Sequence, residues 1–120
     1  MNRLLLTILL LPLCSAHGAS PPEGQSLFAS NCATCHGETG DGNGPAAEAL
    51  ILKPRDFALA AFKFDTDADW QKGTDVDLAD IIREGPAAFG GSQAMPSFPH
   101  LDDTEIQALI GYIRSRQNGS

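Results

Sequence analysis

The sequence predicts a small all-α domain with long loops. Two segments begin with a capping-box pattern, Thr74 with Asp77 and Asp102 with Glu105, and continue with apolar residues at helical spacing. The alternation with period two that marks a half-buried strand occurs over no useful length. Glycines and prolines cluster between the helical segments and indicate loops. The chain has 120 residues, which is enough for one domain.

The first helix is predicted to start at Ser20. This residue can cap a helix that has proline in its first turn and Glu23 at the capping-box position. Gly24, Phe28 and Cys32 then recur every four residues, so they are expected to share one face of this helix. The face leads directly into a cysteine motif.

The segment after this motif is rich in glycine and is predicted to be a loop over residues 37–44. Pro45 is expected to open a short helix that continues through Leu52 and is ended by Pro54. Residues 53–73 show no clear pattern of secondary structure.

Two amphipathic helices are predicted in the second half. The helix capped by Thr74 has Leu78, Ile81 and Ile82 as its apolar face and ends at Gly85. Residues 85–100 contain several glycines and prolines, so Met95 is expected to lie on an irregular loop. The last helix follows the Asp102 cap, with Leu101 placed as a hydrophobic staple on Ile106 and with arginines at its negative end. Its apolar stripe consists of Ile106, Leu109, Ile110 and Ile113.

The N-terminus has the features of a secretory signal peptide. Residues 4–13 form a short apolar run behind Arg3, and small residues follow at 15–19. The run is too short to span a bilayer as a helix. We therefore expect residues 1–18 to be removed and residues 19–120 to form the mature domain in the periplasm.

Cys14 is expected to leave with the signal peptide. A lipid anchor at this cysteine is disfavoured because Leu13 is bulky where a small residue is required. Without residues 1–18 the domain has seven basic and fifteen acidic residues, a net charge of −8. This acidity argues against binding to nucleic acid or anionic lipid and suits protein partners with a basic face. No membrane-spanning segment is expected in the mature form.

The strongest chemical signal is Cys32-x-x-Cys35-His36. This frame suits a dithiol redox centre, a metal clip or covalent haem attachment. A thioredoxin-like dithiol needs a buried strand before the first cysteine, where this sequence predicts a helix. A zinc site could add His100, but neighbouring ligands on a helix project about 100° apart, which suits a tetrahedron poorly. A structural disulfide would explain neither the histidine nor the glycine loop.

Covalent haem accounts for every residue of the motif. The thiols of Cys32 and Cys35 would react with the two vinyl groups of one haem, and His36 would ligate the iron. Met95 is the candidate for the opposite ligand because it lies outside every apolar stripe, although a lone methionine is usually core filler. His100 is the rival ligand, and its position beside Pro99 better suits a surface residue. One covalent haem c is therefore the predicted cofactor.

With these motifs the chain resembles the class I c-type cytochromes, the bacterial monohaem cytochromes c, over nearly all of its predicted mature length. The resemblance implies three main helices and long loops around one haem, with the first and last helices crossing. It places this crossing at Gly24 and Phe28 on one helix and at Leu109 and Tyr112 on the other. Gly24 would allow close backbone approach, and the two aromatic rings would pack edge-on.

Further assignments rest on this resemblance alone. The Gly-Pro pair after the motif implies that the carbonyl of Pro45 holds the ring of His36. The segments KPRDF and FKF resemble a subset of the bacterial monohaem proteins, although acidic residues follow FKF where that subset has basic ones. Arg55 and Trp70 would then bind haem propionates, or else be a solvent-facing arginine and a core tryptophan.

A haem iron with two protein ligands has no open position for a substrate. The expected function is therefore one-electron transfer rather than catalysis, by a monomeric periplasmic carrier that binds its donor and acceptor proteins transiently. Two alternatives remain open. The domain could be a haem subunit of a larger dehydrogenase or oxidase complex, or a haem enzyme or gas sensor in which Met95 dissociates.

Overall fold

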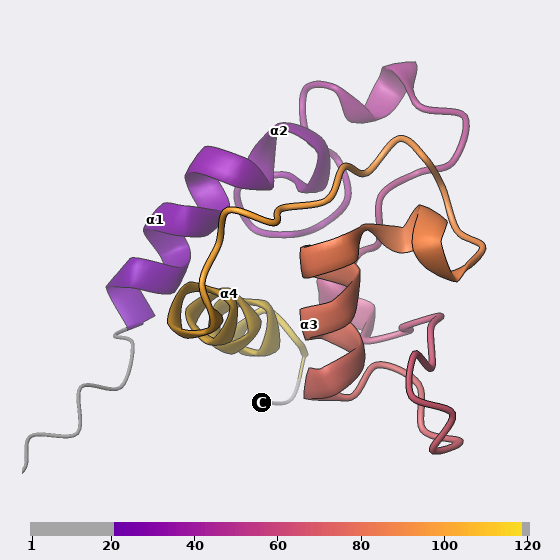
Figure 1. Cartoon of the computed structure of the whole chain (residues 1–120). Helices are drawn as coiled ribbons and strands as arrows, with labels where there is room; N and C mark the ends of the chain where they lie inside the picture. Colours follow the sequence, from indigo (N-terminus) through magenta and orange to yellow (C-terminus); the bar gives the residue numbers. More distant parts are fainter. Residues whose placement is uncertain (1–20, 119–120) are drawn as a thin grey trace, which may run out of the picture.

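The computed structural model describes residues 21–118 (Figure 1). The fold is all-α, as predicted, and no strand occurs among these residues. The predicted signal peptide, Cys14 and the Ser20 cap lie outside the described residues. The helices are α1 (Pro21–Asn31), α2 (Ala33–His36), α3 (Asp75–Glu84) and α4 (Asp103–Ser115), with 3₁₀ turns η1 (Ala47–Ala49), η2 (Phe57–Leu59) and η3 (Pro86–Phe89).

Helices α1 and α4 cross in direct contact (Figure 1). A Cβ atom on Gly24 would overlap the carbonyl group of Ala108, so a glycine is needed for this close approach. Phe28 is 1% exposed and packs on Tyr112, with ring centroids 4.9 Å apart. The rings are tilted by 49° rather than edge-on, and the Tyr112 hydroxyl donates a 2.8 Å hydrogen bond to the carbonyl of Glu38. The predicted edge-on packing of these rings is therefore wrong, and the hydroxyl contact links α4 to the loop after the cysteine motif.

Both predicted capping boxes are present. The Thr74 side chain accepts from the backbone of Asp77, whose carboxylate accepts from the backbone of Thr74, and α3 begins at the next residue. Asp102 and Glu105 make the same reciprocal pair at the start of α4. The apolar stripes predicted for these helices lie in one core with α1, except for Ile81, which is half-buried and outside it. The main members of this core are Phe28, Leu78, Ile82, Leu101, Ile106, Leu109, Ile110 and Ile113.

The prediction of a helix from Pro45 to Leu52 is wrong. The structure has only the single 3₁₀ turn η1 there; the backbone is extended at Leu50 and bends at residues 51–52. Ile51 is fully exposed and Leu52 is 64% exposed, so these side chains find no core surface. An isolated helix of this length is not stable in water without such packing.

Apart from the turn η2, residues 53–73 form loops that side-chain carboxylates hold in place. The carboxylate of Asp65 accepts from the backbone N–H groups of Asp69 and Trp70, and the N–H of Gly73 donates to the carbonyl of Phe64. The indole of Trp70 is 94% exposed, which excludes a core position for it. Among residues 21–118, no helix has the length and apolar character needed to cross a bilayer.

Candidate cofactor site

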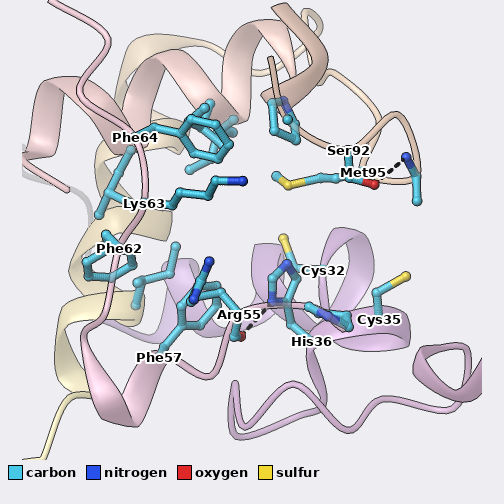
Figure 2. Close-up of a pocket in the computed structure, with 18 of the residues that line it drawn as sticks. Cys32, Cys35, His36, Arg55, Phe57, Phe62, Lys63, Phe64, Ser92 and Met95 are labelled. Carbon is cyan, nitrogen blue, oxygen red and sulfur yellow. Dashed lines mark hydrogen bonds between the residues drawn. The ribbon is translucent and has the colours of Figure 1, made fainter. Parts of the chain in front are cut away.

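An apolar cavity of about 320 Å³ lies between the α1–α2 segment, α3 and the loops before and after α3 (Figure 2). The four residues predicted from sequence to attach and ligate a haem all line this cavity. The cysteine motif and the methionine lie far apart in the chain, and the fold brings them to the same cavity. These four residues are Cys32, Cys35, His36 and Met95.

The cysteine motif lies on one tight helical turn. The carbonyl of Cys32 accepts hydrogen bonds from the backbone N–H groups of Cys35 and His36, at 3.2 and 2.9 Å. Both cysteines are free, with no disulfide between them. Burial raises the pKa of the Cys32 thiol to about 11, and the nearby Cys35 adds to the rise. A dithiol redox centre needs a lowered thiol pKa, so this environment argues against that interpretation.

The zinc interpretation also fails on geometry. His100 is exposed, lies beside Phe98 and does not line the cavity. Within the described part of the chain, the cysteine motif and His100 do not bring their ligand atoms to one point. A tetrahedral site with these residues therefore does not form.

His36 is held in a defined orientation. Its ring stacks on Phe57, with centroids 4.7 Å apart and an interplanar angle of 17°. Its Nδ1 lies 3.2 Å from the carbonyl oxygen of Arg55. Burial lowers the pKa of His36, and the hydrogen bond to Arg55 offsets part of this effect. A neutral imidazole with its Nδ1 occupied presents the other nitrogen as a metal ligand.

The carbonyl partner of His36 differs from the predicted one, Pro45. The residues on either side of Pro45 bond to the backbone of α2 instead: Gly44 donates to the carbonyl of Cys35 at 3.0 Å and Ala46 donates to that of Thr34 at 2.9 Å. The Gly-Pro pair thus packs its main chain on the helix, where a Cβ atom on Gly44 would overlap backbone atoms. No sequence pattern indicates that the backbone carbonyl of residue 55 has this role, because the role does not depend on residue type.

Met95 lies on the irregular loop between η3 and α4, as predicted. Figure 2 shows its side chain entering the cavity on the side opposite His36. A 3.0 Å hydrogen bond from the Phe98 N–H to the Ile82 carbonyl anchors the loop to α3, and a 3.1 Å bond from the Ala94 N–H to Ser92 Oγ shapes the loop beside Met95. The thioether is thus held over the cavity.

The donor set of this cavity fits a covalently bound haem. It offers two free thiols on one helical turn, and an imidazole and a thioether on opposite sides of an apolar space. Of the two residues that the resemblance assigns to the haem propionates, Arg55 lines the cavity and Trp70 does not.

Comparisons with known proteins agree with this geometry. Residues 22–117 match the Cytochrome c family. The chain is 33% identical over 112 residues to the cbb3-type cytochrome c oxidase subunit FixP of Azorhizobium caulinodans, covering 88% of this chain and 32% of that protein. The chain thus spans about a third of the length of this relative.

A similar fold is found in a reducing HAO-like protein complex of Kuenenia stuttgartiensis. The TM-score is 0.66 at 29% sequence identity, and the match covers 79% of this chain and 41% of the other. The family match extends over most of the chain and includes every residue of the cavity described above. The chain belongs to the cytochrome c family, with its all-α fold and a covalently bound haem c.

Proposed function

We propose that this chain is an exported periplasmic electron carrier whose haem is attached at Cys32 and Cys35 and ligated by His36 and Met95. Haem-based electron transfer is the function of its family. The bound haem supplies reversible one-electron chemistry at its iron. The observation that carries the proposal is the opposed placement of His36 and Met95 across a cavity that both cysteines also line.

The protein's own residues determine the properties of such a centre. The stacking on Phe57 and the carbonyl of Arg55 keep the ring of His36 in one orientation. The Met95 thioether and the apolar lining favour the ferrous state, which raises the reduction potential. Two opposed protein ligands leave no open position at the iron, which favours a carrier over an enzyme.

The partners are donor and acceptor proteins bound briefly over a small interface, below about 1,200 Å² of buried surface. The predicted mature domain has a net charge of −8. Association with a partner that presents a basic face should therefore slow as salt increases.

A permanent subunit of a larger complex is the second candidate. It is favoured by the relatives, one of which is an oxidase subunit and the other part of a multiprotein complex. The molecular mass of the exported protein in solution separates the two candidates. A monomer supports the free carrier, whereas stable co-purification with other redox proteins supports the subunit.

The proposal is tested by expressing the full chain together with a haem maturation system and recovering it from the periplasm. An optical redox titration, followed by carbon monoxide addition to the reduced protein, should show a single haem that does not bind the gas. Changing both Cys32 and Cys35 to Ser should abolish covalently retained haem, whereas the control Ser30→Ala should keep it. Colourless wild-type protein would refute the carrier, and rapid binding of carbon monoxide would identify a sensor or enzyme.

A further inference from the structure

Positive charge is concentrated at the cavity of this acidic protein. Seven lysine and arginine residues occur within residues 21–118, and three of them, Lys53, Arg55 and Lys63, line the cavity. The acidic lining residue Asp77 is 1% exposed and accepts hydrogen bonds from Thr66 and Thr74. The Asp77 carboxylate is thus satisfied by hydrogen bonds and does not need the cations at the cavity as partners.

Lys63 differs from the arginines elsewhere on the domain. Arg83 and Arg114 form ion pairs with Asp103 and Asp75, each at 2.7 Å. Lys63 is exposed where it borders the cavity. Within residues 21–118, no carboxylate lies within 4.0 Å of its amino group, and its Nζ lies 5.5 Å from the centroid of the Phe64 ring. Beside an apolar cavity, such a cation is available to pair with an anion that enters the cavity.

The side chain of Lys63 is aimed into the cavity by its neighbours. Phe62 stacks on Phe57 with ring centroids 6.2 Å apart, and the Phe64 carbonyl accepts the Gly73 N–H at 2.9 Å. These contacts fix the backbone on both sides of Lys63. Figure 2 shows its amino group pointing into the cavity from the side opposite Cys35.

We propose that Lys63 binds a propionate group of the haem. This inference rests on the proposed attachment at Cys32 and Cys35, because a haem held there by its vinyl edge has its two carboxylates on the far side of the ring. A carboxylate in an apolar cavity requires a cation or hydrogen-bond donors to offset its lost hydration. Lys63 is a positioning residue for the cofactor, and its charge also favours the ferrous state.

The test compares purified holoproteins in which only the charge at residue 63 changes. Lys63→Gln and Lys63→Leu should lower the reduction potential, since loss of a nearby cation stabilises the ferric state. In both variants, the inflection in a plot of potential against pH should move to higher pH, because a carboxylate without its cation has a higher pKa. Lys63→Arg should restore both values, and Lys72→Gln, which alters a lysine outside the cavity lining, should leave them unchanged. Lys53, Arg55 and Asp77, the other charged groups on the lining, are the same in all variants.

The outcomes separate this inference from the proposed function. Wild-type potential and inflection in both neutral variants of Lys63 would overturn the propionate contact and leave the electron carrier standing. A changed ligand-field spectrum in those variants would make Lys63 an iron ligand and overturn the contact as well. Absence of covalent haem from the wild-type protein would instead refute the carrier.

Discussion

Gly24 of α1 lies directly against the backbone of Ala108 in α4, so that a side chain at residue 24 would overlap the Ala108 carbonyl group. Gly24→Ala should therefore force the two helices apart and lower the free energy of unfolding by about 1–3 kcal/mol. Urea unfolding of the holoprotein, followed by circular dichroism, measures the change. Gly111→Ala is the matched control because no atom lies within 4 Å of its added Cβ, and it should stabilise α4 by about 0.5–1 kcal/mol. Equal unfolding midpoints for the two variants would contradict the close helix contact.

Removal of the Met95 side chain should open one axial position of the haem iron. The Met95→Ala holoprotein should have a lower reduction potential, because the thioether ligand that favours the ferrous state is gone, and its ferrous form should bind carbon monoxide. Gln93→Ala, an exposed position on the same loop, is the control and should behave as wild type. A Met95→Ala protein with the wild-type potential and spectrum would show that another residue ligates the iron.

The buried carboxylate of Asp77 should make the stability of the protein depend on pH. Burial alone would raise the pKa of Asp77, but hydrogen bonds from Thr66 and Thr74 outweigh this effect and lower it. A lowered pKa in the folded state means that the stabilisation is present above the ordinary aspartate pKa and is lost as the pH falls through the lower, folded value. Acid unfolding of the wild-type holoprotein should therefore include a stability loss that begins below about pH 4.

Asp77→Asn should remove this pH dependence and destabilise the protein by about 2–3 kcal/mol at neutral pH, since an amide cannot accept all four hydrogen bonds. The measurement is urea unfolding at several pH values. Asp67→Asn changes an exposed carboxylate in the neighbouring loop and should have little effect. If the two variants unfold alike across this pH range, the buried hydrogen-bond cluster does not stabilise the fold.

The hydroxyl of Tyr112 ties α4 to the loop that follows the cysteine motif. Tyr112→Phe removes its 2.8 Å hydrogen bond to the Glu38 carbonyl and should cost about 0.5–1.5 kcal/mol. Faster amide hydrogen exchange in residues 37–44 should accompany this loss. Tyr112→Leu, which also removes the aromatic contact with Phe28, should be less stable than Tyr112→Phe. Unchanged exchange in the loop would mean that the hydroxyl does not restrain it.

The elements that could be predicted from sequence are those set by local patterns. The capping boxes at Thr74 and Asp102 determine where α3 and α4 begin, since side chain and backbone satisfy each other within four residues. The cysteine motif likewise indicated haem attachment because its spacing is local. Met95 was identified largely by elimination, as a methionine outside every apolar stripe.

The features that could not be predicted depend on contacts between distant segments. The short helix expected after Pro45 is reduced to one turn because Ile51 and Leu52 find no core surface, which no local pattern reveals. The carboxylate of Asp65 organises the loop up to Trp70 through backbone N–H groups, and such bonds leave no apolar periodicity in the sequence. The contact of His36 with the carbonyl of residue 55 also joins distant segments through the backbone and leaves no pattern in the sequence.

The main chain of Arg55, not its side chain, supports His36. The orientation of the imidazole and the charge of the side chain at residue 55 are therefore set independently. Any residue at position 55 can supply the same carbonyl, so the orientation of the imidazole does not depend on which side chain lines the cavity there. Substitutions there could retune the charge that visiting redox proteins encounter, or the driving force for exchange with them, without disturbing the metal's inner coordination. Divergence among relatives at this site would then record adaptation to new partners rather than loss of the centre.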